Sequence, residues 1–283
     1  MQIINTAKQT QQQVNEWRKA GYTIGFVPTM GFLHEGHKSL IDCSVAENDK
    51  TVVSIFVNPT QFAPTEDLEK YPKDFTADST MCQNAGVDLI FFPQNEEMYP
   101  KNFATNITMN GDITKQLCGK SRPTHFSGVC TVVAKLFNIV PADNAYFGKK
   151  DAQQLAIITQ MVQDLNFSVK IIGCPIIREI DGLAKSSRNS YLSADERKAA
   201  VIVSKAIFTG EKLAQENKLT VEQIVNEMHS IIESEPLAKI DYVEIVDLAT
   251  LTKISQNTIA ILGAVAVFIG KTRLIDNFIL ERK

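Results

Sequence analysis

Two of the four histidines lie three residues apart in the segment PTMGFLHEGH, residues 28–37, which directly follows an apolar run at residues 22–27. The run is typical of a buried strand, and the pattern after Gly36 predicts the start of a helix. A glycine-punctuated turn between a strand and a helix presents backbone N–H groups and the positive end of the helix, which together bind phosphate. The segment therefore indicates a nucleotide-binding protein.

The sequence alone leaves three interpretations of His34 and His37 open. The HxxH spacing can ligate zinc, although no third ligand follows at a plausible distance. The pair can instead cap the helix and have no chemical role. An imidazole at a helix start can also donate to phosphate oxygens and stabilise charge that develops in a transition state, a hypothesis that uses both histidines.

The composition is that of an ordinary globular protein. The 283 residues, 44% of them hydrophobic and 22% charged, suffice for one large or two moderate domains. A net charge of −3 gives no bulk electrostatic reason to bind nucleic acid or an anionic membrane. No secretory signal is visible, and the longest apolar run, 259–269, is too short to span a bilayer, so we expect a soluble, cytoplasmic protein. The five cysteines include no CxxC pair and are expected to be buried, reduced thiols.

The first 175 residues alternate between apolar β-branched runs and helical patterns. Strands are predicted at 24–27, 52–57, 89–92, 145–147 and 169–172. Helices are predicted at 38–48, 75–85, 128–139 and 152–165. This order predicts an α/β fold, with a Rossmann-like parallel sheet flanked by helices over residues 1–175 and ligands at the carboxyl ends of its strands.

The pattern changes at residue 176. A polar loop over 181–189 precedes a capping box at Ser193 and Glu196, which predicts a helix to about residue 215. A second helix, capped by Thr220, is predicted to end near residue 233. Further strands are predicted at 240–246, 259–262, 264–269 and 273–279. Residues 176–283 are therefore expected to form a second, smaller α+β domain.

Polar side chains are concentrated in three loops. Residues 58–62 and 148–154 each follow a predicted strand, and amides at such an edge usually bind something, because burying them unpaired is costly. Caps and turns would explain Asn58 and Asp151 individually. The tetrapeptide KSSR, residues 185–188, offers two cations and two hydroxyls that can clamp a triphosphate, although such a loop in isolation is more often a solvated surface.

Six segments together resemble the pantothenate synthetase (pantoate–β-alanine ligase) family of the nucleotidyltransferase superfamily, which has HIGH-type and KMSKS-type motifs. They are PTMGFLHEGH (28–37), VSIFVNPTQF (53–62), YPKDFTAD (71–78), RPTHFSGV (122–129), FGKKDAQQL (147–155) and DGLAKSSRNSYLS (181–193). The resemblance spans nearly the whole chain. It implies ATP-dependent condensation of (R)-pantoate with β-alanine to pantothenate, AMP and diphosphate, through a pantoyl adenylate. It also implies Mg²⁺ held mainly by the ATP phosphates, with no dedicated protein ligand, and a homodimer that binds neither nucleic acid nor membrane.

The resemblance assigns roles to individual residues. It implies that His37 is a proton donor, that His34 touches phosphate and that Lys150 reaches the phosphates. Gln61 is implied to bind pantoate and β-alanine, and Gln154 to bind pantoate. The implied ATP-binding residues are Met30, Gly31, His34, His37, Gly148, Lys149, Lys150, Asp151 at the ribose, Ile177 at the adenine, Lys185, Ser186, Ser187 and Arg188. Less defined roles fall on Asn58, Tyr71, Asp78, Arg122 and His125.

Three positions depart from the usual family pattern, which has an acidic residue in place of Lys149, an aromatic in place of Ala152 and Met in place of Lys185. These departures bear on affinity and pocket shape rather than on the type of reaction.

Other functional classes stay open at this stage. A nucleotidyltransferase that couples a phosphorylated small molecule to a nucleotide would need no amine, and Gln61 and Gln154 suit a hydroxy acid better than a second phosphate. An RNA-binding fragment related to tRNA synthetases would require a basic stripe or an anticodon-binding domain, and the sequence shows neither. A non-catalytic interaction protein would not need to keep Lys150 and both histidines together.

Overall fold

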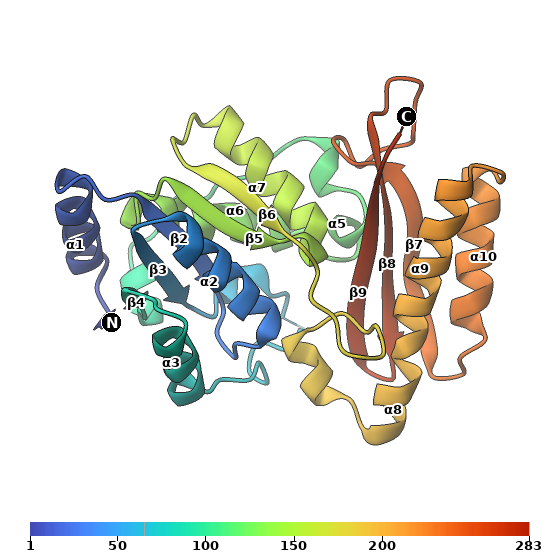
Figure 1. Cartoon of the computed structure of the whole chain (residues 1–283), viewed down its shortest axis with the longest axis horizontal. Coiled ribbons are helices and arrows are strands. Elements are labelled where there is room, and N and C mark those ends of the chain that lie inside the picture. Colours follow the sequence, from blue (N-terminus) through green and yellow to red (C-terminus); the bar gives the residue numbers. More distant parts are fainter. Residues whose placement is uncertain (65, 283) are drawn as a thin grey trace. The chain divides into compact units, whose positions relative to one another are not determined.

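The computed structural model describes residues 1–64 and 66–282 (Figure 1). Contacts divide the chain into two compact units. The first comprises residues 1–110, 122–149 and 157–175, and the second comprises residues 111–121, 150–156 and 176–283. Two segments that precede residue 175 thus pack with the second unit, so the compact units differ there from the predicted domains 1–175 and 176–283.

A parallel sheet forms the centre of the first unit. Its strands are, in spatial order, β1 (Gln2–Ile4), β4 (Leu89–Phe91), β3 (Lys50–Ile55), β2 (Ile24–Thr29), β5 (Asn144–Gly148) and β6 (Lys170–Cys174). Strands β2 and β3 are almost entirely buried, as expected where helices cover both faces of a parallel sheet. The winding reverses at β2, which pairs with β3 on one side and β5 on the other. The loops that follow β2 and β5 therefore start at the same edge of the sheet.

Helices pack on both faces of this sheet. Leu40 and Ile41 of α2 (Glu35–Glu47) and Cys82 of α3 (Phe75–Asn84) join one core cluster with residues of β2, β3 and β4. On the other face, Phe137 of α6 (His125–Ile139) meets Phe26 edge-on. The remaining elements are α1 (Ala7–Lys19), α4 (Asn95–Met98), the 3₁₀ turn η1 (Pro59–Gln61) and α7 (Ala152–Asp164), whose first residues belong to the second unit.

The second unit is built on an antiparallel sheet of β7 (Ala238–Asp247), β8 (Ala260–Ile269) and β9 (Thr272–Glu281). Helices α9 (Val201–Glu216) and α10 (Val221–Glu233) cover one face (Figure 1), and Ile207 and Met228 pack there with Val265 and Phe278. The shorter elements are η2 (Asp112–Thr114), α5 (Cys118–Ser121), η4 (Ser187–Tyr191) and α8 (Ala194–Ala199). The 3₁₀ turn η3 (Lys149–Asp151) begins in the first unit and ends in the second.

The predicted fold class is confirmed, with local corrections. The two strands predicted at 259–262 and 264–269 form the single strand β8, because the ring of Phe278 packs over Gly263 and the ladder continues through it. The helix predicted from 193 to 215 is divided at Ala200 into α8 and α9. Strand β1, only three residues long, was not predicted.

Two further expectations concern cysteines and membranes. Four cysteines are buried, but Cys43 on α2 is only half-buried, so the expectation of five buried thiols is wrong there. No helix in the described part of the chain is long and apolar enough to cross a membrane.

Candidate active site

The loop between β2 and α2 is held in a tight turn by one buried carboxylate. Gly31 and Phe32 have positive φ angles of 83° and 52°. A β-carbon at Gly31 would lie 3.0 Å from both the carboxylate of Asp78 and the side chain of Ile55, so the position favours glycine on steric and conformational grounds. Asp78 accepts from the N–H groups of Phe32 at 2.8 Å and Leu33 at 2.6 Å. Burial raises the pKa of Asp78, and the two amide donors offset part of that rise.

The two histidines close the start of α2. His34 Nδ1 accepts from the N–H of Gly36 at 3.1 Å, and His37 Nδ1 accepts from the N–H of His34 at 3.3 Å, which forms a capping box. The ring centroids are 4.1 Å apart. Because each Nδ1 is an acceptor, each neutral ring carries its proton on Nε2. Both rings therefore cap the helix through Nδ1, which leaves the N–H of each ring on Nε2. The phosphate hypothesis stays a prediction.

Asn58, which follows β3, is almost fully buried at 1% exposure and connects three segments of the first unit. Its side-chain amide donates to Gln61 Oε1 and to the carbonyl of Gly128, each at 3.2 Å. Its Oδ1 accepts from the hydroxyl of Thr60 at 2.9 Å and from that of Tyr99 at 2.7 Å. The cap predicted at Asn58 is present, and the same side chain also supports Gln61.

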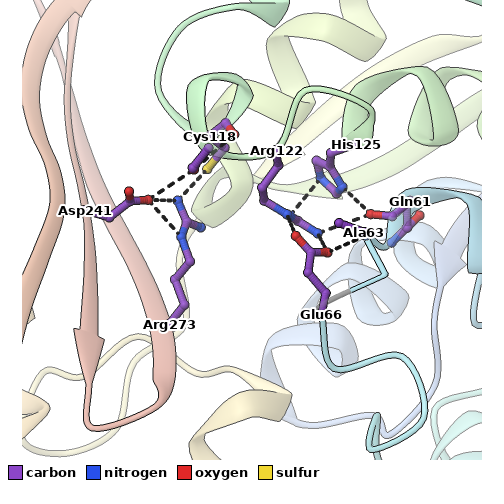
Figure 2. A network of polar contacts seen from close by, with 9 residues as sticks. Gln61, Ala63, Glu66, Cys118, Arg122, His125, Asp241 and Arg273 are labelled. Atoms are coloured by element: carbon purple, nitrogen blue, oxygen red, sulfur yellow. Dashed lines mark hydrogen bonds and ion pairs between the residues drawn. The ribbon is translucent and has the colours of Figure 1, made fainter.

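Gln61 is supported by Arg122, which precedes α6, and by His125, the first residue of α6 (Figure 2). Arg122 Nη2 and His125 Nδ1 contact the backbone carbonyl of Gln61 at 3.2 and 2.8 Å. Because a guanidinium only donates, His125 Nε2 accepts from Arg122 Nη1 at 3.2 Å and Nδ1–H donates to Gln61. The side chain of Gln61 contacts Met30 Sδ at 2.8 Å. Glu66 binds Arg122 in a bidentate pair at 2.6 and 2.7 Å, which fixes the guanidinium.

Close packing further restricts this loop. A β-carbon at Gly128 would lie 2.6 Å from the carbonyl carbon of Thr60 and 2.7 Å from the backbone nitrogen of Gln61, so α6 approaches the loop as only glycine permits. Tyr71, 6% exposed, packs edge-on against Phe62 at 6.0 Å between ring centroids. These contacts leave the Gln61 backbone little freedom.

Glu66 should make the first unit sensitive to acid. Burial opposes ionisation of Glu66, but the hydrogen bonds and charge of Arg122 outweigh it, so the pKa of Glu66 falls below its ordinary value of 4.5. A carboxylate whose pKa is lower in the folded state than in the unfolded state stabilises the fold. This contribution is complete above the unfolded-state pKa, and it is lost as pH falls through the folded-state pKa. Urea unfolding should therefore show that Glu66→Gln is most destabilising above pH 4.5 and that its effect shrinks at lower pH. Exposed Glu69→Gln is the control, and an effect of Glu66→Gln that does not vary with pH would contradict the ion-pair role.

The residues that follow β5 enter the 3₁₀ turn η3. Gly148 ends the strand, and Lys149 follows it in the first unit. In the second unit, the side chain of Lys150 is 19% exposed and its ammonium lies 3.9 Å from the carboxylate of Asp151. Asn277 of β9 donates its side-chain amide to the carbonyl of Lys150 at 2.8 Å. The Lys150 backbone is therefore tied to β9.

The KSSR tetrapeptide belongs to an anchored turn rather than an isolated surface loop. The N–H of Lys185 donates to the carbonyl of Ile177 at 2.9 Å, and Arg178 forms an antiparallel bridge with Ala184. These two contacts close residues 177–185 into a short hairpin.

The charged and polar side chains of the tetrapeptide also have local partners. The ammonium of Lys185 lies 3.1 Å from the carboxylate of Glu179. Ser186 caps η4 and accepts from the N–H of Arg188 at 3.3 Å. The η4 turn therefore begins within the tetrapeptide, which orders the two serines.

Two adjacent glutamines at the start of α7 have different surroundings. Gln153 is 6% exposed, accepts from the N–H of Cys118 at 2.9 Å, and donates to the carbonyls of Ile113 and Gln116 at 2.9 and 2.8 Å. It thus holds the 111–118 segment of the second unit. Gln154 is half-buried on the same turn.

The structure brings many of the predicted site residues together in two sets, one in each unit. In the first unit, hydrogen bonds bring together Met30, Asn58, Gln61, Arg122 and His125. Asp78 holds the histidine loop. In the second unit, Lys150 is tied to β9 and lies beside Asp151, and residues 185–188 follow the anchored turn.

Several residues of these groups were not predicted from the sequence. They are Glu66, Gln153, Arg178, Asp241, Arg273, Asp276 and Asn277. Arg273 contacts Asp241 at 2.7 Å and Cys118 at 3.5 Å (Figure 2), so it joins β9 to α5. Of these residues, only Gln153 lies in a loop that the sequence analysis singled out, where it is adjacent to Gln154.

A parallel sheet that reverses its winding beside a histidine-capped helix defines an α/β protein of the nucleotide-binding class. A sequence model of the family described as Pantoate-beta-alanine ligase matches residues 2–279. The chain belongs to the pantoate–β-alanine ligase family.

Named relatives and solved structures are similar over their full lengths. The pantothenate synthetase of Ruminiclostridium cellulolyticum is 54% identical over 278 residues, which cover 98% of each chain. The crystal structure of pantothenate synthetase from Thermus thermophilus matches with a TM-score of 0.93 at 41% identity, over 98% of this chain and 99% of that one. A pantoate–β-alanine ligase from Francisella tularensis, complexed with βγ-ATP and β-alanine, matches with a TM-score of 0.81 at 39% identity, over 98% and 97%.

Proposed function

We propose that this chain, a pantoate–β-alanine ligase by family, condenses (R)-pantoate with β-alanine through a pantoyl-adenylate intermediate. In the first step a carboxylate oxygen of pantoate attacks the α-phosphorus of ATP, and diphosphate leaves. In the second step the amine of β-alanine attacks the acyl carbon, and AMP leaves with the oxygen that joined it to pantoate. The observation that carries the proposal is the family match across residues 2–279.

The adenylate solves a chemical problem. A carboxylate does not react directly with an amine, because its oxygen is a poor leaving group. Transfer of the adenylyl group turns that oxygen into part of AMP, which leaves readily. The first step brings a carboxylate towards a triphosphate, so the protein must supply positive charge and hydrogen-bond donors before the reaction begins.

In the first unit, the histidine loop is proposed to bind ATP and the Gln61 group to bind the acid. The Nε2–H groups of His34 and His37 donate to phosphate oxygens, with His37 as the proton donor. Met30 and Gly31 line the nucleotide site, and Gly148 and Lys149 follow the adjoining strand. Gln61 holds pantoate, and later β-alanine, by neutral hydrogen bonds that orient the nucleophile without pairing its charge. Asn58, Arg122 and His125 support Gln61 in this role, and Tyr71 packs behind the loop.

In the second unit, the proposed contacts are mainly with the phosphates. Lys150 reaches them from η3, and Asp151 binds the ribose. Lys185, Ser186, Ser187 and Arg188 clamp the phosphates with charge-assisted hydrogen bonds. Ile177 contacts the adenine, and Gln154 is a second pantoate contact.

Mg²⁺ is proposed to arrive with ATP rather than to occupy a protein site. No group of three or more His, Cys, Asp or Glu side chains that could hold a metal ion occurs among residues 1–64 and 66–282. On the two second-unit segments proposed to bind phosphate, Lys150, Lys185 and Arg188 are cations, which pair with phosphate oxygens and not with a metal ion. The ion would neutralise phosphate charge, and these side chains would hold the remaining oxygens.

We propose a cytoplasmic location, which the use of ATP as a substrate supports. A homodimer is proposed on family resemblance.

Replacing Gln61 by alanine should raise the pantoate requirement and leave the ATP requirement nearly unchanged. The loss of one or two neutral hydrogen bonds, each about 1 kcal/mol, corresponds to a rise of about 5- to 30-fold in the KM for pantoate. Steady-state kinetics with pantoate and ATP varied separately measure this, with exposed Gln160→Ala as the control. An unaltered pantoate response would mean that Gln61 only braces its loop.

A further inference from the structure

Two adjacent side chains of β9 each hold one of the phosphate-binding segments of the second unit. They are Asp276, 2% exposed, and Asn277, 5% exposed. Alternate residues of a strand point to opposite faces, so the two side chains leave β9 in opposite directions. One strand can thereby reach two segments that are distant in sequence.

Asp276 holds the turn that precedes the KSSR tetrapeptide. Its carboxylate binds Arg178 in a bidentate pair at 2.6 and 3.0 Å, and the same guanidinium donates to the carbonyl of Gly182 at 3.0 Å. The guanidinium also stacks 4.8 Å from the ring of Phe208 on α9. Arg178 is therefore fixed on two sides, and through its bridge to Ala184 it sets where the tetrapeptide begins.

Asn277 holds the other segment. Its side-chain amide donates to the carbonyl of Lys150 at 2.8 Å, and its own N–H donates to Asp276 Oδ1 at 2.8 Å. The second bond couples the two anchors, because a shift of Asp276 would also displace the backbone of Asn277. Neither contact involves the ammonium of Lys150, which lies 3.9 Å from the carboxylate of Asp151.

We propose that Asp276 and Asn277 are positioning residues that fix the spacing between Lys150 and the 185–188 segment. This rests on the proposed function, in which both segments bind the phosphates of ATP. Donors at a fixed spacing bind a triphosphate without first having to be ordered, and a displacement of about 1 Å can cost as much as 100-fold in rate. β9 thus contributes to adenylation without contacting the substrate.

The test uses Asn277→Leu, which keeps the branched shape of the side chain and removes the donor, with Thr272→Val as a control on the same strand. The readout is pantoate-dependent exchange of labelled pyrophosphate into ATP, with ATP and pantoate varied separately at a temperature where both variants are folded. Asn277→Leu should lower kcat/KM for ATP by about 10- to 100-fold, by analogy with other misplaced catalytic groups, and leave the KM for pantoate within about twofold. Thr272→Val should match the unaltered chain. Unchanged ATP kinetics, or an equal loss for ATP and pantoate, would overturn the proposal.

A second variant tests the Asp276 anchor without relying on activity. Asp276→Asn should speed amide hydrogen exchange at Glu179, Gly182 and Lys185, whose N–H groups are bonded within the turn, while amides of α10 exchange as before. Exchange unchanged in the turn, or raised equally in α10, would overturn the anchor. If the unaltered chain shows no pyrophosphate exchange, the proposed function fails, and hydrogen exchange still decides whether β9 holds the turn.

Discussion

Replacing Lys150 by alanine should slow pyrophosphate release from ATP and pantoate by about 10²- to 10³-fold, as for other preorganised electrostatic groups. The side chain is 19% exposed and its backbone is bonded to Asn277, so its charge is held in place before ATP binds. In the proposed site, truncation removes a positive charge where negative charge shifts between the α- and β-phosphates. Rapid-quench measurement of labelled pyrophosphate isolates this step from the later reaction with β-alanine.

Lys115→Ala is the matched control for Lys150→Ala. Lys115 also lies in the second unit, and its side chain is 64% exposed and forms an ion pair with Asp112 at 3.5 Å. The control should release pyrophosphate at the rate of the unaltered chain. Near-normal pyrophosphate release by Lys150→Ala would show that Lys150 is not a catalytic residue.

Replacing Asp78 by alanine should lower the free energy of unfolding by about 3 kcal/mol and weaken ATP binding. Two buried N–H groups of the histidine loop would lose their acceptor, and each unsatisfied donor costs about 1–3 kcal/mol. For two donors the cost is about 2–6 kcal/mol. The pKa of Asp78 is raised because burying the carboxylate is itself unfavourable, which holds the net loss towards the lower part of the combined range. Urea unfolding and ATP titration at a temperature where the variant is folded measure the two effects.

Asp74→Ala provides the comparison for Asp78→Ala. Asp74 caps the same helix by accepting from the N–H of Ala77 at 3.0 Å, and within residues 1–64 and 66–282 it forms no hydrogen bond with the histidine loop. Loss of a cap costs about 1 kcal/mol and should leave ATP binding unchanged. If both variants lose stability without any change in ATP binding, Asp78 stabilises the fold and does not position the histidines.

The sequence predicted the elements whose signals are local. The apolar run before PTMGFLHEGH and the turn after it define β2, the loop and α2, and the HxxH spacing places both histidines at a helix start. The sequence could not distinguish capping from phosphate binding, because a histidine at a helix start suits either role. In the structure the Nδ1 atoms cap the helix, which leaves the protons on Nε2.

The supporting residues could not be predicted because their partners are distant in sequence. Glu66 pairs with Arg122, Asp276 with Arg178 and Asn277 with Lys150, and no periodicity marks such pairs. The assignment of residues 111–121 and 150–156 to the second unit depends on long-range packing in the same way. Resemblance to the family identified the residues expected to contact substrates. The structure identified the supporting residues that hold those residues in position.

The adenylate intermediate is tested most directly by oxygen transfer. The chain is incubated with ATP, Mg²⁺, β-alanine and pantoate labelled with ¹⁸O in both carboxylate oxygens, and the products are analysed by mass spectrometry. Attack of the carboxylate on the α-phosphorus predicts AMP that carries one labelled oxygen, pantothenate that keeps the other, and an equal amount of diphosphate. Unlabelled AMP, or ADP and phosphate in place of AMP and diphosphate, would contradict the mechanism.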